Sequence, residues 1–364
     1  MISFATDYSS ILERIEIVDP IRYGKTRNFI DGDVTYLSPY ISRGVISVKQ
    51  VKEIVLQKGY KHYQVEKFLQ ELAWREYFQR VWQAKGTAAI NTALKQEQLD
   101  VKHTQMIGAV ANASTGIEAI DQPISKLYET GYMHNHARMY TASVVCNVGK
   151  AHWHQPSKWM YYHLLDGDLA SNNCSWQWVA AAFSSKKYYC NQENINKYCN
   201  SNQRKTFLDK SYDALPEMDI PDALQQTVDL SLNTELPNAT AINIDPSKPV
   251  LVYNSYNLDP NWRKEEDVNR ILLLEPSHFV NYPVSEKVLQ FILDLSKNIE
   301  HIQLFVGEFD ELMQLTGDAV IISKEHPAFE HYTGTKDRRD WMFPQVTGFF
   351  NSFFSYWKKC ERYL

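Results

Sequence analysis

The sequence predicts an all-α region followed by a small C-terminal α/β domain. Apolar residues recur with the period of a helix from residue 1 to about residue 205. Short apolar runs and one amphipathic helix alternate after residue 248, and a polar stretch rich in prolines separates the two textures. We therefore place a helical domain at 1–207, a linker at 208–248 and an α/β domain at 249–364.

Two segments carry the helical pattern most clearly. VEKFLQELAWREYFQRVWQ (Val65–Gln83) and PISKLYETGYMHNHARMYTASVV (Pro123–Val145) place apolar side chains three and four residues apart. Few stretches of this region alternate between apolar and polar residues as a strand would. We expect the first region to be all-α.

The C-terminal region changes period. The helix SEKVLQFILDLSKN stands between the second and the third of its apolar runs, and the order strand, helix, strand argues for a parallel sheet. The four runs, each short enough for one strand, are Pro249–Tyr256, Arg270–Pro276, His301–Phe309 and Asp318–Lys324.

Composition limits the class of protein. A chain of 364 residues with 44% hydrophobic residues can bury a sizeable core, and it shows neither an export signal nor an apolar run of about 18 residues. Its five cysteines are an odd number without CxxC spacing, which favours reduced thiols over disulfides or a metal site. We expect a cytoplasmic protein with no metal ion and no membrane segment.

The net charge of −5 conceals an asymmetry. Up to residue 210 there are 25 Lys and Arg against 19 Asp and Glu, a balance of +6, and afterwards 13 against 24, a balance of −11. The basic first part can hold a phosphate backbone while the acidic second part faces away from it. Compositional drift without function is the alternative explanation.

The segment LLDGDLASNNCSWQW (Leu164–Trp178) combines two aspartates, two asparagines and two tryptophans. A buried core rarely accepts both aspartates, and a solvated helix face rarely carries two tryptophans. The segment therefore predicts a bound partner that hydrogen-bonds and stacks at the same time.

Two helix faces carry similar mixtures. In GYMHNHARMY, the residues Asn135, Arg138 and Met139 share one face, and an inward arginine requires an anion such as Asp166 or Asp168. The alternative is a partly exposed helix whose arginine reaches solvent.

In FLQELAWREYF the same spacing places Glu71, Trp74, Arg75 and Phe78 on one side of a helix. Aromatic residues on a helix often belong to an ordinary core. A glutamate one turn from a tryptophan favours a binding site instead.

These segments resemble the FAD-binding helical domain of the cryptochrome/photolyase family. The similarity runs over roughly residues 20 to 200. Besides the two helix faces it includes YGKTRNFIDGDVTYLSPYISRGVIS, TGIEAID and WHQPSKWMYYHLLDGDLASNNCSWQW, and all these segments follow one another in the same order as in the family. The chain looks most like the cyclobutane pyrimidine dimer photolyases without their N-terminal antenna domain. The partner of Leu164–Trp178 is then a flavin.

The resemblance implies a set of FAD ligands. Arg138 and Asp166 would pair beside the isoalloxazine, Asp168 would bind its pyrimidine edge, Asn172 would face N5, and Asn135 would lie near both flavin and substrate. Hydroxyl and backbone N–H groups where a loop meets a helix suit phosphates. The positions matched to the phosphates and the rest of the cofactor are Tyr23, Thr35, Tyr36, Leu37, Ser38, Phe68 and Arg75.

The resemblance also implies a reaction. In photolyases the excited reduced flavin donates an electron to a pyrimidine dimer flipped out of DNA, and the electron returns after the ring splits. Trp74 and Trp178 would stack on the dimer, and Glu71 would hydrogen-bond to it. The remaining assignments are Met139 for packing, Trp176 and Trp153 for electron transfer to the flavin, and Lys186 and Lys187 for DNA phosphates.

Several positions depart from the family pattern. Tyr132 and His136 replace a usual tryptophan and arginine, and Leu94–Ser114 lacks the outer tryptophan of the electron path. The family's (6-4) enzymes carry histidines at the positions of Asn135 and Met139, so that lesion is disfavoured. We expect a monomeric enzyme acting on dimers in DNA, at lower cost in single strands; the alternative is a photoreceptor or redox flavoprotein without repair activity.

Overall fold

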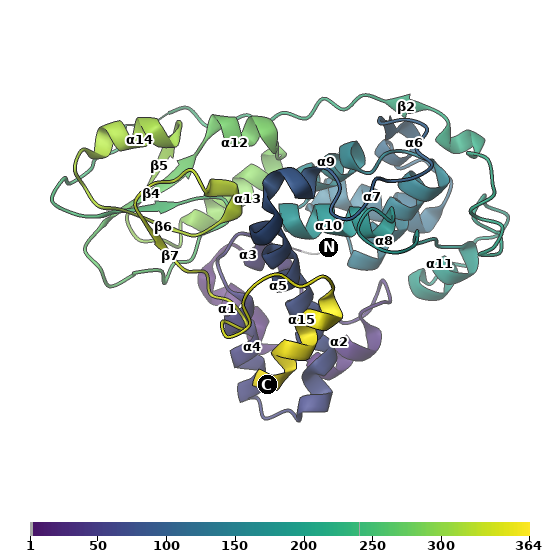
Figure 1. Ribbon diagram of the computed structural model, residues 1–364, viewed down its shortest axis with the longest axis horizontal. Helices are drawn as coiled ribbons and strands as arrows, with labels where there is room; N and C mark the ends of the chain where they lie inside the picture. The colour runs from purple at the N-terminus through teal and green to yellow at the C-terminus, as the bar shows by residue number, and fades with distance from the viewer. Residues whose placement is uncertain (1–2, 240) are drawn as a thin grey trace. The chain divides into compact units, whose positions relative to one another are not determined.

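The computed structural model of the chain describes residues 3–239 and 241–364 (Figure 1). Helices dominate, and one parallel sheet lies in the C-terminal part, which confirms the predicted fold class. No helix in these two ranges combines the length and the apolar character needed to cross a membrane.

The chain divides into two compact units that exchange segments. We call the first the sheet unit, and it comprises Met1–Val18, Thr35–Gln83 and Leu232–Leu364. The second, the helical unit, comprises Asp19–Val34 and Ala84–Ser231. N-terminal helices therefore share a unit with the C-terminal sheet. The domain boundaries after residues 207 and 248, drawn along the sequence, stay a prediction.

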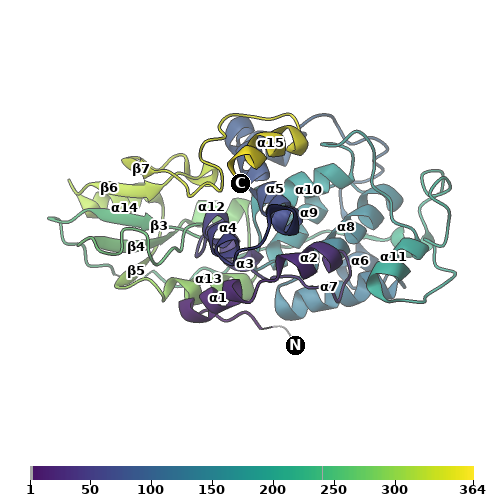
Figure 2. The same cartoon turned by 90° about the horizontal axis from the view of Figure 1, so that it is seen from below.

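The sheet has five parallel strands in the order β5-β4-β3-β6-β7 (Figure 2). In the register of the central strand, Leu251 lies opposite Arg270 on one side and Ile322 on the other. The strands are β3 (Val250–Tyr253), β4 (Asn269–Leu274), β5 (Ile302–Val306), β6 (Ile321–Lys324) and β7 (Thr335–Asp337).

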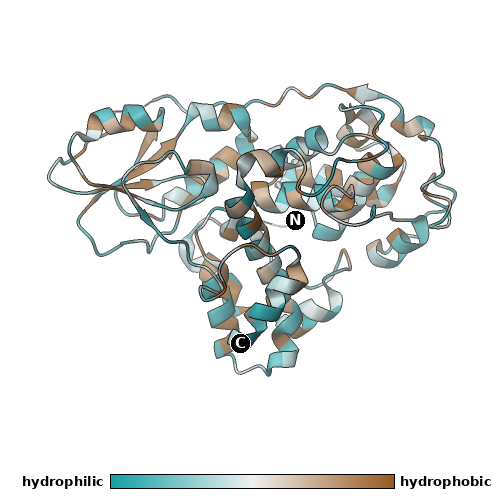
Figure 3. Cartoon of the chain, in the orientation of Figure 1, coloured by the Kyte–Doolittle hydropathy of each residue, from teal (hydrophilic) through white to brown (hydrophobic). Residues whose placement is uncertain are grey.

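The neighbouring strands β3 and β4 are buried along their whole length, as expected for parallel strands with both faces covered. Their apolar side chains give the brown strands of Figure 3. Val250, Val252 and Ile271 pack against Phe309 and Leu312 of α14. The helices between the strands are α12 (Pro276–Asn281), α13 (Glu286–Ser296) and α14 (Phe309–Thr316), of which α13 confirms the predicted amphipathic helix.

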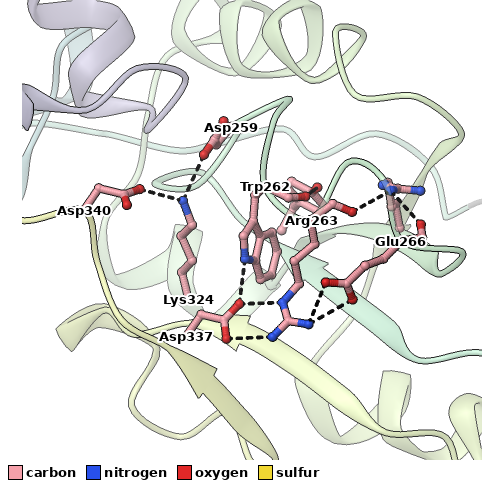
Figure 4. A network of polar contacts seen from close by, with 9 residues as sticks. Asp259, Trp262, Arg263, Glu266, Lys324, Asp337 and Asp340 are labelled. Atoms are coloured by element: carbon pink, nitrogen blue, oxygen red, sulfur yellow. Dashed lines mark hydrogen bonds and ion pairs between the residues drawn. The ribbon is translucent and has the colours of Figure 1, made fainter. Parts of the chain in front are cut away.

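The edge strand β7 was not predicted, because its sequence Thr-Lys-Asp is polar and largely exposed. Side-chain contacts at its last residue, Asp337, join it to the loop after β3 (Figure 4). Arg263 donates from Nε and Nη2 to the Asp337 carboxylate at 2.7 and 3.0 Å, and Trp262 donates from Nε1 at 2.8 Å. The hydrogen bonds from Arg263 lower the pKa of Asp337. Nearby, Lys324 pairs with Asp259 and Asp340.

Four helices from the first ninety residues belong wholly or mainly to the sheet unit: α1 (Tyr8–Glu16), α3 (Ser38–Ser42), α4 (Val48–Gln57) and α5 (His62–Asn91). The side chains of Asp7 and Ser47 cap α1 and α4 by accepting backbone N–H groups. Lys58 donates from Nζ to the carbonyls of Ile15, Glu16 and Val18 at the end of α1, where a cation complements the helix dipole.

The predicted helix over 65–83 is confirmed as part of α5. Gly86 interrupts α5 with φ 79° and ψ 166°, a conformation that side chains with a Cβ rarely adopt.

The helical unit contains the second predicted helical segment, Pro123–Val145, as two helices rather than one. The chain leaves α7 at Gly131, which has φ 71°, and α8 begins at Asn135. The elements of this unit are α2 (Pro20–Thr26), α6 (Gly108–Ala111), α7 (Glu118–Thr130), α8 (Asn135–Ser143), the π-helix Val144–Val148, α9 (His154–His163), α10 (Leu169–Val179) and α11 (Gln192–Cys199).

Part of the predicted linker belongs to the core of the helical unit. Leu208, Leu215 and Leu224 are fully buried there. The strand β2 (Thr227–Val228) pairs with β1 (Met106–Ile107) in a small antiparallel sheet that the sequence did not indicate. These residues are polar enough on average to resemble a surface linker, but their leucines and β-branched side chains serve as anchors.

The last helix of the sheet unit, α15 (Phe353–Cys360), packs against α5 beside a buried carboxylate. Glu76 of α5, which is 2% exposed, accepts hydrogen bonds from the backbone N–H groups of Met342 and Phe343 and from the Tyr356 hydroxyl at 2.5 Å. Arg80, also buried, completes the group at 3.4 Å. One carboxylate thus joins α5 to residues more than 260 positions later in the sequence.

Removing this carboxylate should loosen the C-terminal segment. In Glu76→Ala, Arg80 loses its buried partner and three donors lose their acceptor, so we expect the free energy of unfolding to fall by about 3 to 5 kcal/mol. Chemical denaturation followed by tryptophan fluorescence measures the change. Glu76→Gln, which keeps one acceptor oxygen, should cost less than Glu76→Ala, and equal stability of both variants and the parent would refute this role.

Candidate functional site

The residues predicted for the site fall into two sets, one in each unit. The helical unit holds Tyr23, Asn135, Arg138, Met139, Trp153, Asp166, Asp168, Asn172, Trp176, Trp178, Lys186 and Lys187. The sheet unit holds Thr35, Tyr36, Leu37, Ser38, Phe68, Glu71, Trp74 and Arg75. Each set is described by itself.

Arg138 and Asp166 form an ion pair in the helical unit, in which one guanidinium nitrogen contacts both carboxylate oxygens. Nη2 of Arg138 donates to both carboxylate oxygens of Asp166, at 2.9 and 2.8 Å, and Nε donates to the carbonyl of Met133 at 2.8 Å. The Asp166 side chain is 5% exposed and that of Arg138 is 21% exposed. The alternative in which the arginine reaches solvent unpaired is therefore wrong, and Asp166 rather than Asp168 is the anion.

The turn that carries Asp166 is held against the end of α7. Leu165 donates its N–H to the carbonyl of Gly131 at 2.8 Å, and Gly167 donates to Leu164 at 3.0 Å. Gly131 has no room for a side chain, because a Cβ there would lie 2.6 Å from Cγ of Leu165. The glycine that ends α7 therefore also positions the carboxylate for the arginine of α8.

Asp168 and Asn172 occupy the first turn of α10. Asp168 caps the helix by accepting the N–H of Ser171 at 2.7 Å. The amide nitrogen of Asn172 donates to the carbonyl of Ser157 at 2.9 Å and to Oδ1 of Asn173 at 3.0 Å. A backbone carbonyl can only accept, so the orientation of this amide is fixed, and its carbonyl oxygen is the atom left to meet a ligand.

Asn135 and Met139 lie on the exposed side of α8, one turn apart. The amide nitrogen of Asn135 approaches Sδ of Met139 at 4.0 Å. Asn135 is the first residue of the helix and Met139 is half-buried. Together with Arg138 they form the mixed face that the spacing predicts.

Two histidines flank this face, of which His134 is buried and His136 is half-buried. His134 precedes α8 rather than lying on it, and its Nδ1 accepts the N–H of His136 at 3.1 Å as the helix cap. Burial first, and then the charges of His136 and Arg138, lower the pKa of His134 to about 4. His136 packs its ring against Tyr140 and Tyr198, and burial lowers its pKa too. Where the family has an arginine, this chain therefore has a packing residue.

The other departure, Tyr132, keeps an aromatic ring against the guanidinium. Its ring centroid lies 5.6 Å from Cζ of Arg138. Tyr132 thus supplies a cation–π partner for Arg138 in this chain.

The tryptophans differ in exposure as their predicted roles require. Trp176 is 2% exposed and Trp153 is fully buried, whereas Trp178 is 37% exposed and leans on Tyr188 with ring centroids 5.7 Å apart. Buried indoles suit electron transfer, and an exposed indole suits stacking against a base. These roles stay predictions.

Of the two lysines predicted to bind phosphate, Lys187 already has a partner. Asp100 accepts from Lys187 at 3.5 Å and from Lys150 at 2.5 Å. The hydrogen bond from Lys150 is the main cause that lowers the pKa of Asp100, which keeps the carboxylate charged. Lys186 is exposed and is the better candidate for a phosphate contact.

In the sheet unit, Arg75 lies beside the short helix that begins at Ser38. Its Nη2 donates to Oγ of Ser42 on α3 at 2.6 Å. The preceding turn is held by Oγ1 of Thr35, which accepts the N–H of Leu37 at 3.4 Å, and Tyr36 adopts a positive φ of 53°. The Arg75 guanidinium thus meets the end of α3, and the Thr35 hydroxyl lies before its start. Guanidinium and hydroxyl groups are donors that suit phosphate.

Trp74 has a ring partner that the sequence did not indicate. Phe353 of α15 stacks on its indole with ring centroids 3.8 Å apart and planes 11° apart. One face of the indole is therefore covered by the protein itself. The signal was present in the aromatic sequence FFSYW (Phe353–Trp357), but its distance along the chain concealed the contact.

Part of the chain is similar to DNA photolyases. Residues 68–219 match the family model described as the FAD binding domain of DNA photolyase. A deoxyribodipyrimidine photo-lyase of Synechococcus sp. is 30% identical over 169 residues, which cover 44% of this chain and 35% of that protein. The mitochondrial enzyme of that name from Saccharomyces cerevisiae is 29% identical over 157 residues, covering 40% and 28%.

Solved structures of the family are also similar. A cryptochrome of Synechocystis sp. has a TM-score of 0.49 and 23% identity, covering 54% of this chain and 44% of its own. A class III photolyase of Agrobacterium tumefaciens has a TM-score of 0.45 and 21% identity, covering 60% and 52%.

The similarity to deoxyribodipyrimidine photo-lyases lies in the segment that matches the FAD-binding domain. It spans about a third of the length of the curated relatives it matches. The family match covers Arg138, Asp166, Asp168 and Asn172.

Breaking the ion pair should destabilise the helical unit. In Arg138→Ala the carboxylate of Asp166 stays buried without its partner, so we expect a loss of about 3 kcal/mol in the free energy of unfolding. Arg138→Lys keeps the charge but loses the hydrogen bond from Nε to the Met133 carbonyl and should lie in between. Denaturant titration of the three proteins measures this order, and unchanged unfolding in Arg138→Ala would contradict it.

Acid should destabilise the protein through His134. Its pKa is about 4 in the folded protein against an ordinary value of 6.5, so the unfolded chain takes up the proton first as the pH falls. Stability is full above pH 6.5 and should fall by about 3 kcal/mol between pH 6.5 and 4. His134→Asn, which can still cap the helix, should remove this part of the slope in unfolding curves measured across that range; an unchanged slope would exclude His134 as its source.

Proposed function

We propose that the protein repairs cyclobutane pyrimidine dimers in DNA by light-driven electron transfer from reduced FAD. The observation that carries the proposal is the buried pair of Arg138 with Asp166, followed on α10 by Asp168 and Asn172. These four residues lie in the segment that matches the photolyase FAD-binding domain. The protein would act as a cytoplasmic monomer with damaged DNA as its partner.

The donor set fits a flavin ring. Nε and Nη2 of Arg138 donate to protein acceptors, which fixes the position of the guanidinium. Its positive charge can compensate negative charge on reduced flavin. Asp168 would accept a hydrogen bond from the pyrimidine edge. The free carbonyl oxygen of Asn172 would accept one from an N–H at N5, which favours a ring protonated there.

FAD, when bound, supplies the electron that splits the dimer and recovers it afterwards. The protein would bind and orient the lesion, with Trp178 and Trp74 stacking on its bases. Glu71 and Asn135 would hydrogen-bond to its carbonyl groups, and Met139 would pack against it. The exposure of Trp178 and the position of Asn135 at the start of α8 support these roles.

A cryptochrome-like photoreceptor or redox flavoprotein is the second candidate. The covered face of Trp74 favours it, because Phe353 occupies one side of a ring that repair would use for stacking. The absence of a tryptophan between Leu94 and Ser114 concerns both candidates, since both draw electrons through Trp176 and Trp153. Repair of dimers by the reduced protein separates them.

The decisive experiment illuminates chemically reduced protein with an oligonucleotide that contains a thymine dimer. We expect dimers to disappear in blue or near-ultraviolet light and to persist in the dark. Trp176→Phe should abolish photoreduction of oxidised flavin but spare repair by protein reduced beforehand, because the repair electron does not cross Trp176. Trp178→Ala should weaken dimer binding by roughly 1 to 3 kcal/mol and leave photoreduction intact.

The outcomes separate the two functions. Persistence of dimers under light, with FAD bound and reduced, would contradict repair and leave the photoreceptor. Impairment of the same step by both substitutions would contradict the division of Trp176 and Trp178 into electron transfer and substrate binding.

A further inference from the structure

The C-terminal segment 341–364 differs in composition from the acidic region that contains it. It carries three cations, Lys358, Lys359 and Arg362, against one acid, Glu361. Nine of its residues are aromatic: Trp341, Phe343, Phe349, Phe350, Phe353, Phe354, Tyr356, Trp357 and Tyr363. Aromatic side chains interleaved with cations are typical of surfaces that bind single-stranded nucleic acid.

Packing explains the inner face of α15. Phe353, Tyr356 and Trp357 are each no more than 4% exposed, and they contact α5 or the hydrogen-bonded group around Glu76. The C-terminal residues of the segment are thereby held in place by a buried network. The core therefore accounts for these aromatic residues without any ligand.

Packing does not explain Phe354. Its side chain is 69% exposed although it lies next to the buried Phe353. One turn further along the same face stands Lys358, also exposed. A phenylalanine and a lysine at this spacing present a flat apolar ring and a cation about 6 Å apart at their Cβ atoms.

The exposed ring stands next to the indole assigned to the lesion. Phe354 and Trp74 have ring centroids 6.5 Å apart with planes at 80°, and Phe353 stacks on the same indole. The contacts fix α15 on α5, so Phe354 has a defined position beside Trp74. A strand whose base reaches Trp74 would bring its neighbouring nucleotides to Phe354.

We propose that the outer face of α15 binds the unpaired nucleotides that flank the lesion, with Phe354 stacking on a base and Lys358 pairing with a phosphate. This inference rests on the proposed function, because it assumes that the lesion binds at Trp74. The partner is a single strand of DNA, because the bases of a duplex are stacked on one another and cannot meet the ring. This surface would bind strands that are already unpaired.

The test compares full-length variants on two substrates that share the lesion. One is a thymine dimer without flanking nucleotides, and the other is the same dimer inside a labelled single strand, with affinities measured in the dark. Phe354→Ala should weaken binding of the flanked strand by roughly five- to tenfold and leave the bare dimer unchanged. Phe354→Trp should retain the affinity.

Lys358→Ala tests the phosphate contact. It should weaken the flanked strand and reduce the slope of log affinity against log salt by about one unit or less. Val280→Ala and Lys297→Ala remove an exposed apolar side chain and an exposed cation from α12 and from the residue after α13, and both should bind like the parent. Since Phe354 and Lys358 are exposed, melting curves should show all variants folded.

The results bear on this proposal independently of repair. Parent-like affinity of Phe354→Ala for the flanked strand would overturn it even where dimers are repaired, and so would an equal loss on both substrates, which would mean that Phe354 acts only through Trp74. If no variant repairs dimers while Phe354→Ala still weakens binding of an undamaged strand, the proposed function fails and the binding surface stands.

Discussion

The buried ion pair between Arg138 and Asp166 is the interaction on which the candidate site depends. An arginine whose side chain is only 21% exposed must find an anion. Its Nη2 contacts both oxygens of Asp166 and its Nε the Met133 carbonyl, and together these contacts fix the orientation of the guanidinium. That requirement fixes the turn before α10 relative to α8. These contacts hold the guanidinium in one position within the protein itself.

A second buried charge organises the sheet unit in the same way. Glu76 has its carboxylate surrounded by two backbone N–H groups, a hydroxyl and Arg80, and three of these four partners come from the C-terminal segment. A carboxylate this deep is tolerated only when it is fully hydrogen-bonded. The segment 341–360 is therefore anchored in the core through its buried residues, although it lies more than 240 positions from α5 along the chain.

Local sequence patterns were enough to predict the strands and helices whose apolar side chains follow one regular spacing. The strands β3 to β6 and the helix α13 were predicted, because apolar runs and helical periodicity report burial directly. The polar edge strand β7 gave no such signal and is held by Arg263 and Trp262 from another loop. Gly131 broke a segment whose periodicity continued across it, since a left-handed glycine outweighs the pattern.

The site was predictable only where partners lie close in sequence or follow a known motif. The choice of Asp166 over Asp168 needed the turn geometry around Gly131, and the stacking of Phe353 on Trp74 joins residues 279 positions apart, which no local window contains. The stacking of Phe353 limits how Trp74 can bind a ligand. Its indole offers a ligand at most one open face, and the other is set by α15. The binding role proposed for α5 thus depends on the packing of the C-terminal segment, which Glu76 holds from within the core.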